Sequence, residues 1–208
     1  NKQANQSEKA PAIKFEKTLA KKFVSELPFK LTDSQRKVIW QIYLDLQKTM
    51  PMNRLVEGDV GSGKPLVALR AMIQAHESGW QAALMAPTQI LAEQHYLNFR
   101  RILDPLGIPV VLRTSARKEG SSEADLFNPA KSSVPPLVVG THALLFEGAE
   151  FEKLGLVVID EQHKFGVLQR SRLIGRADAP DVLVMTATPI PRTAAMTVYG
   201  DLDVSVLD

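Results

Sequence analysis

Short apolar runs alternate with segments of helical spacing along most of this chain. Several of the runs are apolar at every position, which is typical of strands buried on both faces of a parallel sheet. The alternation therefore predicts an α/β fold, with a mostly parallel open sheet and helices on both of its faces. The runs that predict strands cover residues 54–56, 82–85, 110–113, 137–139, 156–159 and 182–185. The spacing predicts helices over residues 66–77 and 90–103, and shorter ones near 143–146, 168–174 and 192–198.

Two further helices are predicted before the first strand. Residues 13–27 carry apolar side chains at roughly helical spacing, and Pro28 ends that segment. Thr32 begins a second helix that has one apolar face. We expect residues 1–28 to form a tail and a linker helix, and residues 29–208 to form one α/β domain.

The composition narrows the class of protein. Of the 208 residues, 45% are hydrophobic, which is enough for a sizeable core and argues against global disorder. The formal net charge is +2, so any nucleic-acid binding has to come from local features. The absence of cysteine excludes disulfides and thiolate sites and is compatible with a cytosolic protein. No run of about 18 apolar residues predicts a membrane span. The chain begins without Met, and we expect it to be a domain of a longer protein.

The segment between the first predicted strand and the helix after it has the frame of a phosphate-binding loop. Two glycines with four residues between them, followed by a lysine, let successive backbone N–H groups point at an anion. The helix that follows offers its unpaired N–H groups to the same phosphate, and the lysine adds a positive charge. The alternative is a glycine-rich turn that binds nothing. The residues predicted to bind nucleotide are Gly58, Asp59, Val60, Gly61, Ser62, Gly63, Lys64 and Pro65.

Pro65 departs from the loop pattern, which has Ser or Thr at this position. The hydroxyl of Ser or Thr would ligate Mg²⁺, and proline has neither that hydroxyl nor a backbone N–H. Proline also biases Lys64 away from the α region, although it is well tolerated at the start of a helix. The hypothesis from the sequence is that the fold survives, nucleotide binding is weakened and hydrolysis is weakened more strongly.

Asp160 and Glu161 follow a buried strand candidate. An aspartate in this place beside a phosphate loop suits Mg²⁺, which keeps much of its hydration shell. The adjacent glutamate can orient and deprotonate an attacking water. The alternative is an ordinary acidic strand end, but the pairing with the phosphate loop favours a catalytic pair.

Three polar motifs also have a purely structural interpretation. Gln35 lies three residues after Thr32, which is the spacing of a capping box, and the spacing alone favours that over an adenine contact. Pro87 and Thr88 fit the start of a helix, and residues 186–189 fit a polar turn. The histidines at 142 and 163 are too far apart to indicate a metal site.

Five motifs stand in an order that resembles the first motor domain of superfamily two helicases. After the phosphate loop come Ala86-Pro87-Thr88, Gly140-Thr141-His142, Asp160-Glu161-Gln162-His163 and Thr186-Ala187-Thr188-Pro189. Longer stretches resemble the RecG family of branched-DNA translocases, among them APTQILAEQHY at 86–96, LGLVVIDEQHKFGVLQR at 154–170 and MTATPIPRT at 185–193. The resemblance covers about residues 29–208.

This resemblance implies a RecA-like P-loop NTPase fold and a motor that uses ATP and Mg²⁺. It implies that Phe29 and Gln35 contact adenine, that Lys64 binds phosphate, that Asp160 holds Mg²⁺ and that Glu161 activates water. Contact with DNA, or coupling to it, is implied for Pro87, Thr88, Gly140, Thr141, His142, Gln162, His163, Thr186 and Thr188.

The resemblance also implies partners. These are branched double-stranded DNA such as stalled forks and Holliday junctions, and a wedge domain and second motor domain of the same full-length chain. It implies a role in recombination and repair in the bacterial cytoplasm, at the nucleoid and not at a membrane. Because the second motor domain would supply an arginine finger, we expect this chain alone to hydrolyse ATP weakly or not at all. Pro65 leaves one alternative open, a degenerate motor that binds nucleotide or DNA without efficient hydrolysis.

Overall fold

A single parallel sheet forms the centre of the molecule. The structure is a computed structural model that describes residues 13, 17–27, 30–114, 136–141, 151, 153–161, 179–191, 193–194, 197 and 202–208. The sheet has the order β3-β4-β2-β5-β6-β1-β7, and all of its strand pairs are parallel. The strands are β1 (Asn53–Gly58), β2 (Gln81–Met85), β3 (Val110–Arg113), β4 (Leu137–Gly140), β5 (Leu154–Glu161), β6 (Asp181–Thr186) and β7 (Asp203–Leu207).

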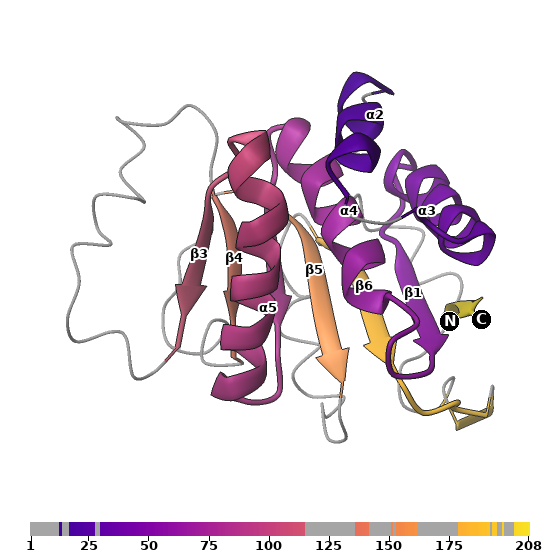
Figure 1. Cartoon of the computed structure of the whole chain (residues 1–208). Coiled ribbons are helices and arrows are strands. Elements are labelled where there is room, and N and C mark those ends of the chain that lie inside the picture. The colour runs from indigo at the N-terminus through magenta and orange to yellow at the C-terminus, as the bar shows by residue number, and fades with distance from the viewer. Residues whose placement is uncertain are drawn as a thin grey trace.

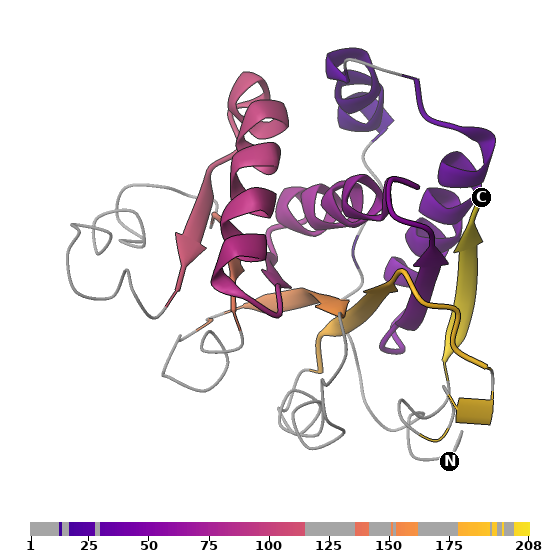
Figure 2. The same cartoon turned by 60° about the horizontal axis from the view of Figure 1, so that its bottom comes forward.

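The helices α2 (Lys17–Glu26), α3 (Asp33–Leu46), α4 (Lys64–Glu77) and α5 (Gln89–Leu103) lie on one face of this sheet (Figures 1 and 2). The helix α4 crosses the middle of the sheet, with α5 on one side of it and α3 on the other (Figure 1). No helix among the described residues has the length and apolar character needed to cross a bilayer. The 3-10 helix η1 (Asp104–Leu106) follows α5.

Alternate residues of the strands contribute to two apolar cores, one on each face of the sheet. Leu84 and Val158 pack in the same core as Leu69 of α4, whereas their neighbours Ala83 and Val157 pack in the second core. Burial of both faces explains why the strands read as continuous apolar runs. The predicted α/β fold with an open parallel sheet is confirmed. Helices on the second face stay a prediction, because α2 to α5 all lie on the first face. The short helices predicted near residues 143–146 and 168–174 lie outside the described residues, and the one near 192–198 is described only in part.

The strand β7 (Asp203–Leu207) is an element that the apolar pattern did not predict. It lies at the edge of the sheet beside β1, where Ser205 and Leu207 are buried and Val206 is exposed. Its run has a serine at its centre, so it lacks the continuous apolar character of the runs that predicted the other strands. The six predicted strands are all present, and each extends to or beyond its predicted bounds.

A buried polar network explains the serine in β7. The guanidinium of Arg54 in β1 donates to the carboxylate of Asp45 in α3, at 2.6 and 2.9 Å, and to the hydroxyl of Ser205, at 2.8 Å. The Ser205 hydroxyl in turn donates to Gln41 Oε1 at 2.7 Å. The network thereby ties α3 and the edge strand to β1.

The N-terminal helix α2 packs against α3 and α4. Phe23 is fully buried in the helix-side core, and the backbone N–H of Ile13 donates to Leu46 O at 2.8 Å. The Arg70 guanidinium lies between the rings of Phe23 and Tyr43, 5.5 and 5.1 Å from their centroids. Burial raises the pKa of the Tyr43 phenol to about 12. The boundary at residue 28 stays a prediction.

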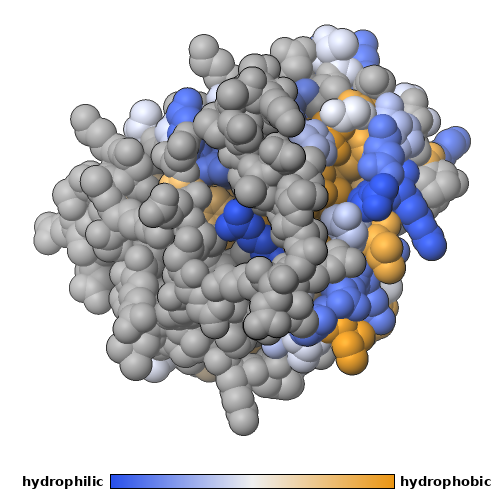
Figure 3. Space-filling view, turned by 90° about the vertical axis from the view of Figure 1, so that its left-hand side faces the viewer, coloured by the Kyte–Doolittle hydropathy of each residue, from blue (hydrophilic) through white to orange (hydrophobic). Residues whose placement is uncertain are grey.

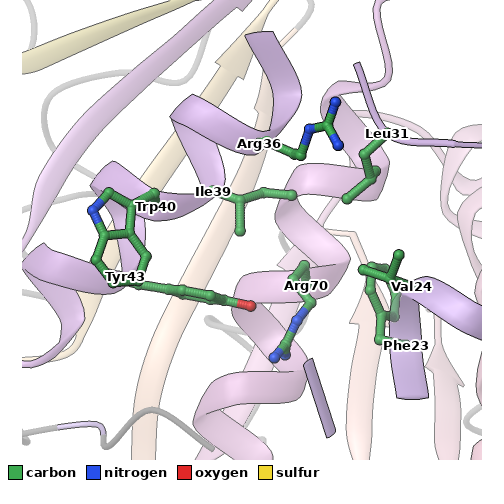
Figure 4. Close-up of a pocket in the computed structure, with 8 residues that line it drawn as sticks. All are labelled: Phe23, Val24, Leu31, Arg36, Ile39, Trp40, Tyr43 and Arg70. Carbon is green, nitrogen blue, oxygen red and sulfur yellow. The ribbon is translucent and has the colours of Figure 1, made fainter. Parts of the chain in front are cut away.

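A pocket of about 160 Å³ opens between these three helices (Figure 4). Its surface is apolar apart from the two arginines, and Arg70 points toward the Tyr43 hydroxyl in the close-up. The residues of the phosphate loop are not among those that line it. The lining residues are Phe23, Val24, Leu31, Arg36, Ile39, Trp40, Tyr43 and Arg70.

The described surface on the side of β3 and α5 is mixed. Hydrophilic side chains lie next to small hydrophobic areas in the coloured part of the space-filling view (Figure 3). The exposed apolar side chains of α5 include Ile90 and Leu97, which are 70% and 56% exposed. Single exposed apolar residues of this kind are normal on a protein surface and do not by themselves indicate a binding partner.

Candidate active site

The carboxyl ends of the parallel strands meet at one edge of the sheet. In the strand register Thr186 lies beside both Glu57 and Glu161, and Met85 lies beside Gly140. The phosphate loop begins at the end of β1, and the loops after β2, β4, β5 and β6 begin at the same edge. Gly58, Pro87, Gly140, Asp160 and Thr186 therefore lie along one edge of the sheet, where open parallel sheets bind their ligands.

The phosphate loop is folded tightly against its neighbours, which explains two of its glycines. A Cβ atom at Gly58 would lie 2.5 Å from Ser62 Oγ and 3.0 Å from Leu207 Cβ in β7. Gly63 has a φ of 86°, and a Cβ there would collide with the Gln35 amide. A side chain at either position would therefore push the loop out of its place between β7 and α3.

Lys64 lies within this loop. Its Nζ donates to the backbone carbonyls of Gly58 and Asp59, the latter at 2.8 Å, and the residue is buried. Burial lowers the pKa of the Lys64 ammonium, and the carboxylates of Asp160 and Asp59 oppose that shift. The loop thus holds a positive charge at the place that the sequence pattern assigns to phosphate.

Pro65 is compatible with this fold. The helix α4 begins at Lys64, with Gly63 as its N-cap and Pro65 in the first turn. The N–H that proline lacks has no intrahelical partner at such a position, so no helical hydrogen bond is lost. The expectation that the fold survives is confirmed, and α4 begins at Lys64 in spite of the bias that the following proline imposes.

Asp160 contacts a residue to which the sequence patterns assigned no role. Its Oδ2 lies 2.6 Å from Nε2 of His95 in α5, and the two side chains are 19% and 11% exposed. The sequence carried one usable signal, since His95 follows Thr88 by seven residues. That spacing places His95 two helical turns after Thr88, on the same face of α5.

Gln35 joins the phosphate loop to the helix α3. The capping box with Thr32 is present, with Gln35 N donating to Thr32 Oγ1 at 3.1 Å and Thr32 N donating to Gln35 Oε1 at 3.0 Å. The Gln35 Nε2 group donates to Ser62 O at 2.9 Å. The capping interpretation is confirmed, the contact with the loop is new, and the adenine contact stays a prediction.

The turn after β6 and the start of α5 have the local structures that their purely structural interpretations predict. Thr88 caps α5 by accepting from Leu91 N at 3.3 Å. Thr186 Oγ1 accepts from Thr188 N at 3.2 Å and so closes a polar turn. The contacts of these threonines with DNA stay predictions.

Several predicted site residues cannot be placed. Phe29, His142, Gln162 and His163 lie outside the described residues, as does the side chain of Glu161. Thr141 directly follows β4, whose last residue Gly140 accepts a backbone hydrogen bond from Ala86 N at 2.8 Å. The roles assigned to all of them stay predictions.

The residues at this edge fit a nucleotide phosphate, and fit Mg²⁺ in part. Among the described residues no group of three or more His, Asp or Glu side chains could hold a metal ion by itself. Mg²⁺ usually takes one or two carboxylates and completes its shell with water and substrate phosphates, so the single carboxylate of Asp160 is enough on the protein side. Pro65 contributes no oxygen ligand.

Comparison with known proteins supports the same conclusion. The family model described as DEAD/DEAH box helicase matches residues 32–197, which is most of the chain. This chain belongs to the DEAD/DEAH box helicase family. The match confirms the resemblance to superfamily two helicases that the ordered motifs indicate.

Within this family, the chain is similar to RecG helicases. It is 52% identical over 190 residues to the ATP-dependent DNA helicase RecG of Synechocystis sp., and this covers 91% of the chain and 23% of the relative. It is 46% identical over 209 residues to the RecG helicase of Aquifex aeolicus, which covers 100% of the chain and 26% of the relative. The chain thus spans about a quarter of the length of the curated relatives that it matches.

Solved structures support the same fold. A RecG bound to a three-way DNA junction is 40% identical with a TM-score of 0.85, over 100% of this chain and 28% of that chain. The helicase domain of Pyrococcus furiosus Hef is 22% identical with a TM-score of 0.58, over 83% of this chain and 37% of that chain. The second likeness concerns the fold alone. The RecA-like fold is thereby confirmed.

Proposed function

We propose that this chain is the first motor domain of an ATP-dependent DNA helicase that remodels branched DNA in recombination and repair. The observation that carries the proposal is the meeting of the phosphate loop, Asp160 and the strand-end loops at one edge of the sheet. The family of the chain and its similarity to a RecG bound to a three-way DNA junction support the ATP and branched-DNA parts of the proposal.

In this proposal the chain supplies one wall of the ATP site. The backbone N–H groups of the loop and the Lys64 ammonium bind the phosphates, while Asp160 orients Mg²⁺ through its carboxylate. Mg²⁺, when bound, neutralises charge that develops on the phosphates. Glu161 acts as the base that orients the attacking water, and Gln35 reads the adenine edge.

The strand-end loops supply the DNA contacts in this proposal. Hydroxyls and backbone N–H groups of the loops after β2, β4 and β6 hold DNA phosphates, which fixes position without reading sequence. A second motor domain of the full-length protein closes the ATP site with an arginine finger, and a wedge domain engages the branch point. We place the full-length protein in the bacterial cytoplasm, at the nucleoid.

Pro65 favours a second candidate function, a degenerate motor that binds nucleotide or DNA but turns over poorly. Proline leaves the first turn of α4 without the hydroxyl that would ligate Mg²⁺ and without one N–H that would face a phosphate. The two candidates differ in hydrolysis and in the dependence of nucleotide affinity on Mg²⁺. They do not differ in fold.

A comparison of the wild type with the Pro65→Thr variant, both as full-length proteins, tests both candidates. We expect DNA-stimulated ATP hydrolysis in both proteins, with Pro65→Thr faster by roughly tenfold or more because it regains a metal ligand. Equal rates would remove the case for the degenerate motor, and hydrolysis in the threonine variant alone would establish it. Absence of DNA-stimulated hydrolysis from both proteins would contradict the proposed function.

The 208-residue chain alone should hydrolyse ATP slowly with either proline or threonine at position 65. Robust DNA-stimulated turnover by this chain would contradict the need for the second motor domain.

A further inference from the structure

The side chains of His95 and Asp160 form a close contact between α5 and β5. The Nε2 and Oδ2 atoms are 2.6 Å apart, and both side chains are largely buried. A carboxylate that binds Mg²⁺ is ionised and only accepts hydrogen bonds, so Nε2 is assigned as the donor of this pair. Charge-assisted hydrogen bonds of this length are among the stronger ones in proteins.

His95 lies on a helix that starts in one of the strand-end loops. Thr88 caps α5, and seven residues, or about 10 Å of helix, separate it from His95. The loop before the cap is fixed to the next strand, since Ala86 N donates to Gly140 O at 2.8 Å. A rigid helix therefore connects the loop after β2 to the carboxylate in β5.

Packing alone does not account for a histidine at this position. The ring of His95 lies 6.0 Å from the ring of Phe99, at an interplanar angle of 43°, so a phenylalanine would serve an apolar contact of that kind. The 2.6 Å contact with Asp160 needs an N–H donor, which phenylalanine lacks. The imidazole Nε2–H holds Oδ2 of Asp160 in a fixed direction.

We infer that His95 is a positioning residue for Asp160, holding that carboxylate in the orientation in which it binds Mg²⁺ with nucleotide. The inference rests on the proposed function, in which Asp160 is the metal ligand. A hydrogen-bond donor behind a ligating carboxylate fixes its orientation and raises metal affinity. Because His95 is carried by α5, a displacement of the loop at Thr88 moves the donor and alters the metal site.

The experiment measures the Mg²⁺ concentration at half-maximal binding of a fluorescent ADP to the full-length protein. Three variants separate the hydrogen bond from packing. His95→Phe keeps a ring without a donor, His95→Gln places an amide N–H at a reach similar to Nε2, and His95→Asn carries the same amide on an arm one methylene shorter. Melting temperatures confirm that each variant is folded, and the two amide variants keep the test valid where His95→Phe fails to fold.

We expect His95→Phe and His95→Asn to raise the required Mg²⁺ concentration by roughly 10- to 100-fold, and His95→Gln to restore it to near the wild-type value. Binding of ADP without Mg²⁺ should be the same in all four proteins. Equal Mg²⁺ dependence in wild type, His95→Phe and His95→Asn would overturn the inference, and so would a His95→Gln variant as impaired as His95→Asn. Mg²⁺-independent nucleotide binding by the wild type would instead contradict the proposed function itself.

The link through α5 has its own readout in the same assay. Addition of a three-way DNA junction should shift the Mg²⁺ requirement of the wild type and of His95→Gln, but not that of His95→Phe or His95→Asn. A junction that leaves the Mg²⁺ requirement of the wild type unchanged, or shifts it equally in all four proteins, would overturn the link while leaving the positioning role intact.

Discussion

Glu57 accepts a hydrogen bond from the backbone N–H of Ile190, with 3.1 Å between Oε1 and N. Glu57 directly precedes the phosphate loop, and Ile190 directly follows the polar turn after β6. Glu57 belongs to no motif that the sequence singles out, and Ile190 lies in the stretch MTATPIPRT without a role assigned to it. Their contact joins the predicted ATP site to a loop that the family resemblance assigns to DNA.

Removal of this contact should weaken the coupling between DNA and ATP hydrolysis. In the full-length protein, we expect Glu57→Ala to reduce the stimulation of ATP hydrolysis by branched DNA by roughly 3- to 10-fold, since a hydrogen bond contributes about 1 kcal/mol. Glu57→Gln keeps an acceptor oxygen and should behave like the wild type. The measurement is the ratio of hydrolysis rates with and without DNA. An unchanged ratio in Glu57→Ala would show that the contact is only structural.

Gln35 offers a way to separate the helix cap from the loop contact. Glutamate at this position keeps an oxygen for Thr32 N but cannot donate to Ser62 O. We expect Gln35→Glu to weaken binding of a fluorescent ADP by roughly fivefold or more. The hydrogen bond to Ser62 O is lost, and a carboxylate oxygen then faces the carbonyl oxygen, which is repulsive. Its melting temperature should stay within a few degrees of the wild type.

Gln35→Ala is the matched comparison for that experiment. It loses the cap acceptor as well as the loop contact, so it should lose about 1 kcal/mol of stability in addition to nucleotide affinity. Equal ADP affinities in the wild type, Gln35→Glu and Gln35→Ala would show that Gln35 serves the helix alone.

Asp181 makes the stability of the fold depend on pH. The residue is fully buried at the start of β6, and Met52 N donates to its Oδ1 at 2.6 Å. Burial raises the pKa of this carboxyl to about 8, with the nearby Asp45 adding to the shift and the Met52 hydrogen bond opposing it. The folded protein therefore retains a proton that the unfolded chain releases above about pH 4.

The retained proton sets the direction in which the stability of the fold changes with pH. This group's contribution to stability is fully present below the unfolded pKa and is lost progressively as the pH rises toward about 8. We expect Asp181→Asn to be more stable than the wild type at pH 8, with a melting temperature higher by roughly 2–4 °C per kcal/mol gained. The difference should shrink toward pH 4. A difference that stays constant from pH 4 to pH 8 would contradict the buried neutral carboxyl.

The buried network around Arg54 should contribute strongly to stability. Asp45→Ala would leave the Arg54 guanidinium, whose side chain is 10% exposed, without its partner in α3. We expect this change to cost about 3 kcal/mol in the free energy of unfolding, measured by denaturant titration. Asp33→Ala breaks the exposed ion pair with Arg36 and should cost less than about 1 kcal/mol. Equal costs for the two variants would show that the network around Arg54 is no stronger than a surface pair.

The sequence predicted the elements whose signals are local. Apolar runs predicted six strands because a parallel sheet buries both of their faces, and the capping box at Thr32 and Gln35 was visible from spacing alone. The edge strand was missed because it is half-buried and has Ser205 at its centre. That serine is explained by Arg54, which is 151 residues away in the chain.

The candidate site shows the same contrast between local signals and contacts that are distant in the sequence. The phosphate loop and Asp160 were predicted because their motifs are contiguous and their order is specific. His95 and Glu57 were missed because their partners, Asp160 and the Ile190 backbone, are 65 and 133 residues away. Contacts of this kind depend on the strand order of the sheet, which no local pattern contains.

The central claim is that the loop from Gly58 to Lys64 binds the phosphates of ATP. The most direct test is a titration of the 208-residue chain with a fluorescent ADP in the presence of Mg²⁺, comparing the wild type with Lys64→Ala. Lys37→Ala, which removes an exposed lysine of α3, is the matched control. We predict saturable binding that Lys64→Ala weakens by roughly tenfold or more, equivalent to about 1.4 kcal/mol, and that Lys37→Ala leaves unchanged. Saturable binding of equal affinity in all three proteins, or no binding by the wild type, would contradict the claim.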